Sequence, residues 1–176
     1  GSEAMLNNNN GYSNVAIGAS ALYSNTIKNN IVAIGDSALF NNGIGATIAG
    51  MADGNTAVGS KTLYQNTIGA NNTALGFWAL HYNVTGTLNT AMGYLSSIAN
   101  ISGIYNTSVG GHALQSNRFS SHNVAIGNDA LKLFNPAAEE DGNNVAIGNY
   151  ALHQHAAGVD NVAVGRSALS FNYAGN

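Results

Sequence analysis

Nine glycines divide this chain into units of nearly constant length. Successive glycines are 17, 24, 17, 17, 17, 17, 21 and 17 residues apart, so a 17-residue unit is interrupted once by seven residues and once by four. This period predicts a stack of equivalent coils, because so short a unit can bury apolar side chains only against its neighbours. The glycines are Gly18, Gly35, Gly59, Gly76, Gly93, Gly110, Gly127, Gly148 and Gly165.

Almost every glycine closes the frame Asn-(Val/Thr)-Ala-aliphatic-Gly, and Ala-Leu follows after two variable residues, as in residues 14–22. The β-branched and aliphatic residues favour a strand. Side chains alternate across a strand, so these two columns share one face and the alanines occupy the other. We expect the two bulky columns to fill the inside of the coil and the alanines to admit a neighbouring chain. The glycine should supply a positive φ or close backbone packing.

The Ala-Leu segment precedes a turn rich in Asn, Thr and Gly. We expect a second strand here, rather than a helix, because only four or five residues separate the glycine from the turn. The fifth unit departs from the pattern, with Ser96 and Ser97 in place of Ala-Leu. The recurring asparagines are expected to form a ladder of amides that hydrogen-bond from coil to coil.

The predicted fold is all-β: a parallel β-solenoid of about nine 17-residue coils with two strands each. It forms a single domain over residues 14–176, with insertions near residues 42–54 and 134–142. Residues 1–13 are expected to be a lead-in that begins with a tag remnant. One leucine and two medium-sized apolar side chains per coil make a small core, so association with further copies should supply the missing burial.

Composition and motifs exclude several classes of function. Only 7% of residues are charged, the net charge is −3 and no basic run occurs, so nucleic acid is not an expected partner. No apolar run approaches the roughly 18 residues of a membrane span. The one acidic cluster, Glu139-Glu140-Asp141, is interpreted as a solvated loop, and no nucleophile elbow, phosphate loop or zinc spacing occurs. We expect neither an enzyme nor a cofactor.

The unit resembles the head repeats of trimeric autotransporter adhesins of the YadA-like type, whose hallmark is Val-Ala-Ile-Gly. That tetrapeptide stands at residues 15–18, 32–35, 124–127 and 145–148. The longer form, Asn-Thr-Ala-x-Gly-x-x-Ala-Leu, also looks like repeats of phage-tail-fibre-like proteins. The resemblance implies a left-handed β-roll and a homotrimeric adhesive fibre at a cell surface or phage fibre tip. Its partner would be a cell-surface glycan or protein. A purely structural spacer, with binding elsewhere in a longer fibre, is the alternative.

Aromatic residues gather where sister units carry polar ones. They would form a flat platform for sugar rings or an apolar partner; the alternative is packing at a trimer interface or under the first insertion. The insertion is a second candidate, because loops on a rigid scaffold often carry function. The candidate binding residues are Phe77, Trp78, His81, Tyr82, Tyr94, Met51 and Asp53.

Two weaker interpretations concern metal and ice. His153 and His155 would share a face of a strand, so three copies around one axis could hold a transition metal. The sister residues, such as Tyr23 and Asn25, indicate instead ordinary histidines at an outer or loop-edge position. A column of four threonines suggests ice binding, but it shares the aliphatic face, which we expect to point inward.

Overall fold

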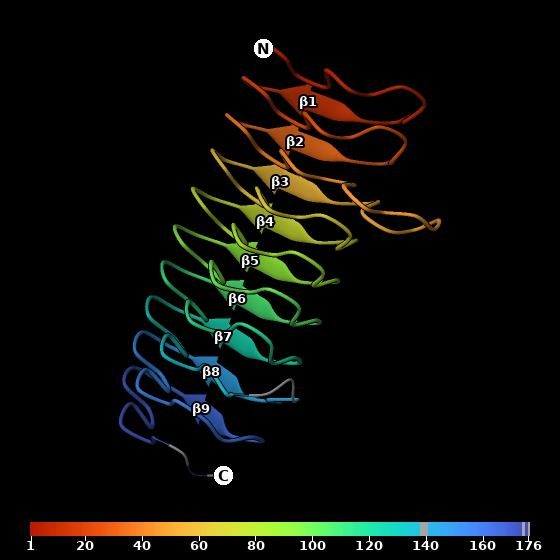
Figure 1. The fold of residues 1–176 in the computed structure, drawn as a ribbon. Coiled ribbons are helices and arrows are strands. Elements are labelled where there is room, and N and C mark those ends of the chain that lie inside the picture. The colour runs from red at the N-terminus through yellow and green to blue at the C-terminus, as the bar shows by residue number, and fades with distance from the viewer. Residues whose placement is uncertain (138–140, 174, 176) are drawn as a thin grey trace.

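The computed structural model describes residues 1–137, 141–173 and 175. Nine short strands form one parallel sheet, and each strand pairs with the next one along the chain (Figure 1). The strands are β1 (Val15–Ile17), β2 (Val32–Ile34), β3 (Thr56–Val58), β4 (Thr73–Leu75), β5 (Thr90–Met92), β6 (Thr107–Val109), β7 (Val124–Ile126), β8 (Val145–Ile147) and β9 (Val162–Val164). The described residues contain no helix. The predicted parallel β-solenoid of about nine turns is confirmed.

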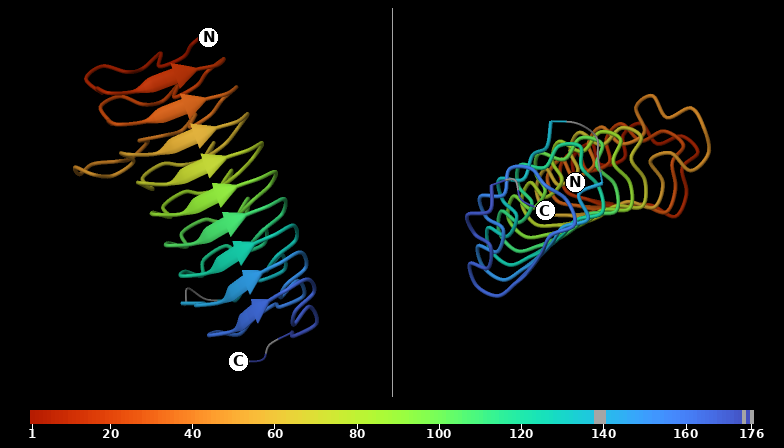
Figure 2. Two further views of the ribbon diagram at one scale, coloured as in Figure 1. Left: turned by 180° about the vertical axis from the view of Figure 1, so that it is seen from behind. Right: turned by 90° about the horizontal axis from the view of Figure 1, so that it is seen from below.

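The two insertions leave the register of the sheet unchanged. Val32 pairs with Thr56 across the first insertion, and Val124 pairs with Val145 across the second. Viewed along the stack, the coils follow one another with a steady shift, and the first insertion projects to one side (Figure 2). The extra residues of the first insertion are therefore accommodated in a loop outside the stack.

The strands place their alanines inside the coil and their bulkier residues outside. Ala33 and Ala91, at the centres of β2 and β5, are fully buried, whereas the flanking residues are half-buried or exposed. The expectation that the bulky columns fill the interior was wrong. The physical reason is that leucines such as Leu39 and Leu80 fill the interior from the opposite wall. Only a methyl group then fits between the leucine and the strand.

The Ala-Leu segment is a series of turns, so the expectation of a second strand was also wrong. Each coil has one strand in the part of the chain that the structure describes. Leu39 has a φ of 53° and Ser37, two residues earlier, also has a φ of 53°. These left-handed residues bend the chain so that Ala38 and Leu39, although adjacent, are both fully buried. In a strand they would face opposite sides. Burying a leucine contributes about 1.5–3 kcal/mol, which offsets most of the roughly 1–2 kcal/mol that each left-handed residue costs.

Asparagine side chains form the expected ladder and a second one beside it. In the first, Asn72 Oδ1 accepts the backbone N–H of Asn89 at 3.0 Å. In the second, which follows the leucine, Asn83 Nδ2 donates to Asn66 Oδ1 at 2.8 Å. All four side chains are buried. Their amides therefore satisfy polar groups that the interior would otherwise leave unpaired.

The glycines provide both of the features expected of them. Gly93 has a φ of 137°, which disfavours residues with a Cβ atom. A Cβ at this position would lie 2.5 Å from the carbonyl oxygen of Gly110 in the next coil. The glycine column therefore allows successive backbones to approach closely.

The fifth unit replaces part of the apolar core with a hydroxyl cluster. Ser96 Oγ and Ser97 Oγ each donate to Ser108 Oγ at 2.8 Å, and all three side chains are buried. Ser108 is also the one serine in the alanine column. The two departures from the repeat therefore compensate each other, and the cluster separates two apolar core clusters.

Residues 1–13 lie above β1 and continue the stack. Gly1 and Met5 stand 17 residues before Gly18 and Leu22. Met5 has a φ of 54° and packs against the apolar core. This segment therefore covers the core at the first strand.

We expect Gly93→Ala to lower the free energy of unfolding by about 3–5 kcal/mol, because it combines a strained φ with overlap of the next coil's backbone. Gly165→Ala is the matched control: its φ is 124°, but a Cβ there meets no atom within 4 Å. The free energy of unfolding of the control should fall by only about 1–2 kcal/mol. Chemical denaturation of both variants measures the difference. Equal losses would show that close stacking is not what requires glycine.

Candidate binding surfaces

The outward face of the sheet carries two uncharged columns. Apolar side chains on it are exposed, including Ile17, Leu75, Met92, Ile126, Ile147 and Val164. The first column consists of Val15, Val32, Thr56, Thr73, Thr90, Thr107, Val124, Val145 and Val162, and the second of Ile17, Ile34, Val58, Leu75, Met92, Val109, Ile126, Ile147 and Val164. A continuous apolar strip of this kind is typical of an interaction surface.

The candidate aromatic residues separate into an exposed set and a packed set. Phe77 and Tyr94 stack across neighbouring coils with ring centroids 5.9 Å apart, and both are about half exposed. Tyr82 is also exposed and contacts the edge of the His81 ring. Trp78 stacks on His81 at 4.4 Å, and its indole Nε1 is buried without a hydrogen-bond partner in the described residues. Phe77, Tyr82 and Tyr94 are therefore the accessible members.

His81 ends a column of stacked rings that the sequence analysis did not identify. Tyr23 stacks on Phe40 at 4.8 Å, Phe40 on Tyr64 at 5.2 Å, and Tyr64 on His81 at 5.3 Å. Each ring stands five residues after the glycine of its unit. That common position was a signal in the sequence from which the stack could have been found. His81 is consequently buried, and its Nδ1 lies 2.9 Å from the Lys61 carbonyl oxygen.

The first insertion is held to the stack by polar contacts. Asp53 Oδ1 accepts the backbone N–H of Asn29 at 2.8 Å. The buried Lys28 side chain donates to the Ile48 carbonyl oxygen at 3.1 Å. Met51 is half-buried, whereas Ile48 is exposed. The Asp53 carboxylate thus anchors the loop, and the exposed isoleucines of the insertion, Ile44 and Ile48, are residues that sequence reasoning did not select.

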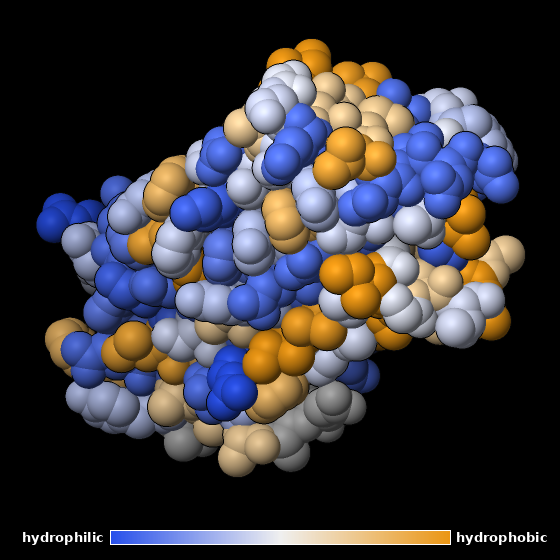
Figure 3. Space-filling view, turned by 45° about the horizontal axis from the view of Figure 1, so that its top comes forward, coloured by the Kyte–Doolittle hydropathy of each residue, from blue (hydrophilic) through white to orange (hydrophobic). Residues whose placement is uncertain are grey.

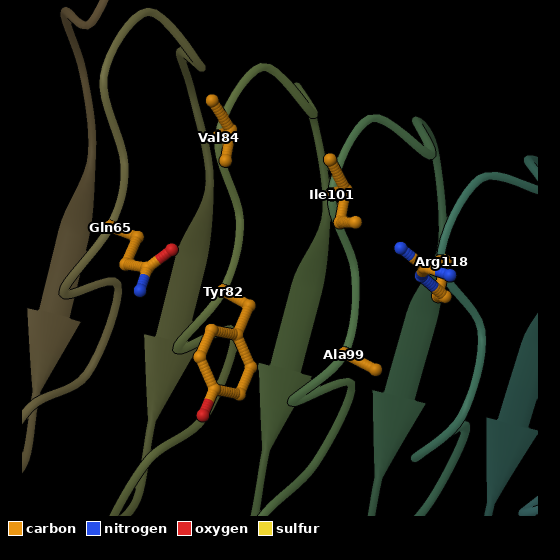
Figure 4. Close-up of a pocket in the computed structure, with 6 residues that line it drawn as sticks. All are labelled: Gln65, Tyr82, Val84, Ala99, Ile101 and Arg118. Carbon is orange, nitrogen blue, oxygen red and sulfur yellow. The ribbon is translucent and has the colours of Figure 1, made fainter.

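A groove of about 300 Å³ lies among the turns that follow β3 to β6 (Figure 4). Its lining brings together residues from four successive coils, and only Tyr82 was a candidate from the sequence. No local motif marks the others, because they meet only through the stacking of the coils. The lining residues are Gln65, Tyr82, Val84, Ala99, Ile101 and Arg118.

The two histidines considered for metal binding occupy different environments. His155 takes the place of an asparagine in the second ladder, where it is fully buried and stacks on Phe134. Its Nδ1 lies 2.8 Å from the Asn172 carbonyl oxygen. The expectation of an outer position was wrong for His155, which fills the coil interior. His153 packs against the edge of Tyr150 instead. Among the described residues, no three His, Cys, Asp or Glu side chains form a metal-binding group.

The second insertion contributes one contact between a histidine and a carboxylate in its described part. His122 Nδ1 lies 2.9 Å from Asp141 Oδ1, and both side chains are substantially exposed. Glu139 and Glu140, the other members of the acidic cluster, lie outside the described residues. Of this acidic cluster, the structure therefore describes the contact of one carboxylate, that of Asp141 with His122.

Other parts of the surface are mixed in character. On the side shown in Figure 3, apolar side chains lie in patches between hydrophilic ones.

The described part of the chain includes no helix with the length and apolar character needed to cross a membrane. Comparison of the chain with protein-family models, curated proteins and solved structures found no match.

Acidification should destabilise the protein through His81. Burial lowers the pKa of His81, more than the hydrogen bond to the Lys61 carbonyl raises it, and the nearby Lys61 charge lowers it further. The unfolded chain therefore binds this proton more tightly. The contribution to stability is present above the unfolded pKa, near 6.5, and is lost as the pH falls through the folded value.

The test compares the wild type with His81→Tyr, because Tyr64 already occupies this column. Thermal unfolding between pH 7.5 and pH 5 should show a smaller fall in Tm for the variant. Parallel curves would contradict a role for His81.

Proposed function

We propose that this chain is a non-catalytic segment of a homotrimeric extracellular fibre. Three left-handed solenoids would pack their outward sheet faces around a common axis. The observation that carries this proposal is the uncharged double column on β1 to β9, which leaves Leu75, Met92 and Val164 exposed in a single chain. Burial of these side chains in water is favourable in proportion to their apolar area. The resemblance to head repeats of trimeric adhesins supports the same arrangement.

The structure changes the reason for expecting a trimer. The alanine column is buried inside each coil, so it cannot contact a neighbouring chain. Instead, two columns of Val, Thr and larger aliphatic side chains are available for contact. Side chains from such flat faces can interdigitate as they do between packed sheets. The small core of each coil makes this additional burial more valuable.

We infer that adhesion uses the turns, which remain accessible when the sheet faces are covered. The stacked pair Phe77 and Tyr94, the groove beside Tyr82 and the first insertion all lie outside the strands. Three copies of a weak site on one fibre would gain avidity for a cell-surface glycan or protein. If the turns bind nothing, the remaining role is a structural spacer.

Leu75→Glu should convert the trimer to monomers, because it places charges in the apolar contact. Leu133→Glu is the matched control: Leu133 is 45% exposed and Leu75 46%, but Leu133 lies in a turn. Sedimentation equilibrium should give a trimer for the wild type and the control. A monomeric wild type, or equal dissociation of both variants, would overturn the proposed interface.

Ice binding is a second candidate, because the threonine column points outward and not inward as the sequence analysis expected. Thr56, Thr73, Thr90 and Thr107 are in register on adjacent strands, about 4.8 Å apart. They present a regular row of hydroxyl and methyl groups. This role competes with trimer formation, since both use the same face.

If the row binds ice, the wild type should show thermal hysteresis, and Thr90→Lys should reduce it severalfold by inserting a bulky charge into the row. Thr85→Lys, at an exposed turn position, is the control. Absence of hysteresis in the wild type would exclude this candidate and leave the trimer interface unaffected.

A further inference from the structure

The groove arises from irregular residues in otherwise equivalent turns. Tyr82 and Ala99 occupy the position six residues after the glycine in consecutive units, so a large side chain is followed by a small one. Val84 and Ile101 occupy the position eight residues after the glycine in the same two units, where several sister units carry Thr, Gly or Asn. The small Ala99 therefore leaves a hollow bordered by an aromatic ring and two aliphatic side chains.

Polar side chains stand at the two ends of this hollow. Figure 4 shows Gln65 and Arg118 on opposite sides, with the aromatic and aliphatic residues between them. Arg118 is exposed, and its guanidinium lies 4.9 Å from the centre of the Phe119 ring. The contact with an aromatic face restrains the guanidinium without neutralising it. Neither ion pair between described residues includes Arg118.

The combination of these groups identifies a class of ligand. A pyranose ring has one face of C–H groups, which suits Tyr82, Val84 and Ile101, and hydroxyls at its rim, which suit the Gln65 carboxamide. The unpaired guanidinium adds a donor fork that matches a planar carboxylate or a sulfate. The groove has a volume of about 300 Å³ and runs across four coils that are about 4.8 Å apart, so Gln65 and Arg118 suit neighbouring residues of an oligosaccharide and not one ring.

We propose that this groove binds a pyranose that carries a carboxylate or sulfate group, with the anion on Arg118 and the ring against Tyr82. The inference rests on the proposed adhesive function and names the ligand class for one of its surfaces. In the trimer the groove lies on turns and not on the packed sheet, so each fibre offers three copies.

Calorimetric titration of the full chain with a glucuronic acid oligosaccharide tests the proposal. The neutral glucose oligosaccharide of the same length should bind at least about tenfold more weakly, because it lacks the charge-assisted hydrogen bonds. A sulfated oligosaccharide distinguishes the two possible anions. Arg118→Gln should weaken binding of the glucuronic acid oligosaccharide by about tenfold or more, and Tyr82→Ala by about threefold to tenfold.

Arg166→Gln is the matched control, since it removes the same charge from an exposed position in the last coil. It should change the affinity by less than about twofold. Equal weakening by Arg118→Gln and Arg166→Gln would overturn the proposal, as would equal binding of the neutral and acidic sugars. A hexaglutamate peptide that competes with equal affinity would also overturn it, because the groove would then bind any carboxylate.

A glycan array separates this inference from the broader proposal. Binding to neutral glycans that survives Arg118→Gln would overturn the groove assignment and leave glycan adhesion intact. Binding to no glycan would contradict both, and would favour the structural spacer. The sedimentation result for Leu75→Glu reports on the trimer independently of either outcome.

Discussion

The fold depends on backbone hydrogen bonds between coils of almost identical outline. Val15 N–H donates to the Ile31 carbonyl at 2.8 Å and Gly35 N–H to the Ile17 carbonyl at 2.7 Å, and equivalent bonds recur along the stack. Bonds of this kind require every coil to lie directly on its neighbour. Few residue types therefore fit at positions where the backbone lies close to the next coil or where the side chain points into the interior. Glycine, alanine, leucine and asparagine occupy those positions.

Side chains that point away from the stack do not have to fit against the next coil. The features that distinguish one coil from another occur at these positions. The variable turn residues produce the stacked Phe77 and Tyr94, the groove at Arg118 and the projecting first insertion. The outward strand positions hold Thr, Val, Ile, Leu and Met, and none of them holds a charged residue. A rigid stack thus presents an apolar strip on its sheet and chemically varied turns elsewhere, which is the separation of surfaces on which the proposed fibre role depends.

The repeat frame predicts the one strand that each coil contains, but the second predicted strand is absent and the buried face of the first is the reverse of the expected one. The alternation of Asn, Val or Thr, Ala and an aliphatic residue is compatible with either orientation, and the bulk of a side chain does not by itself indicate that it faces the interior. The variability of the columns was the better signal. A column that holds Ala eight times and Ser108 once is sterically restricted, whereas one that accepts Met92 as well as Val58 is not. The leucine was likewise assigned to a strand, because local propensity does not indicate a left-handed φ.

Spacing along the chain is enough to specify the 17-residue period, the parallel in-register stack, the role of the glycines and the asparagine ladder. Each of these follows from spacing along the chain, since equal spacing places like residues next to each other. Which face of the strand is buried becomes clear only in the folded chain, because it depends on how far Leu39 and its equivalents reach across the coil. The tertiary structure also decides which aromatic side chains remain accessible and that Gln65, Tyr82 and Arg118 border one groove. Those relations depend on the volumes and directions of side chains from different coils, which no pattern within one unit contains.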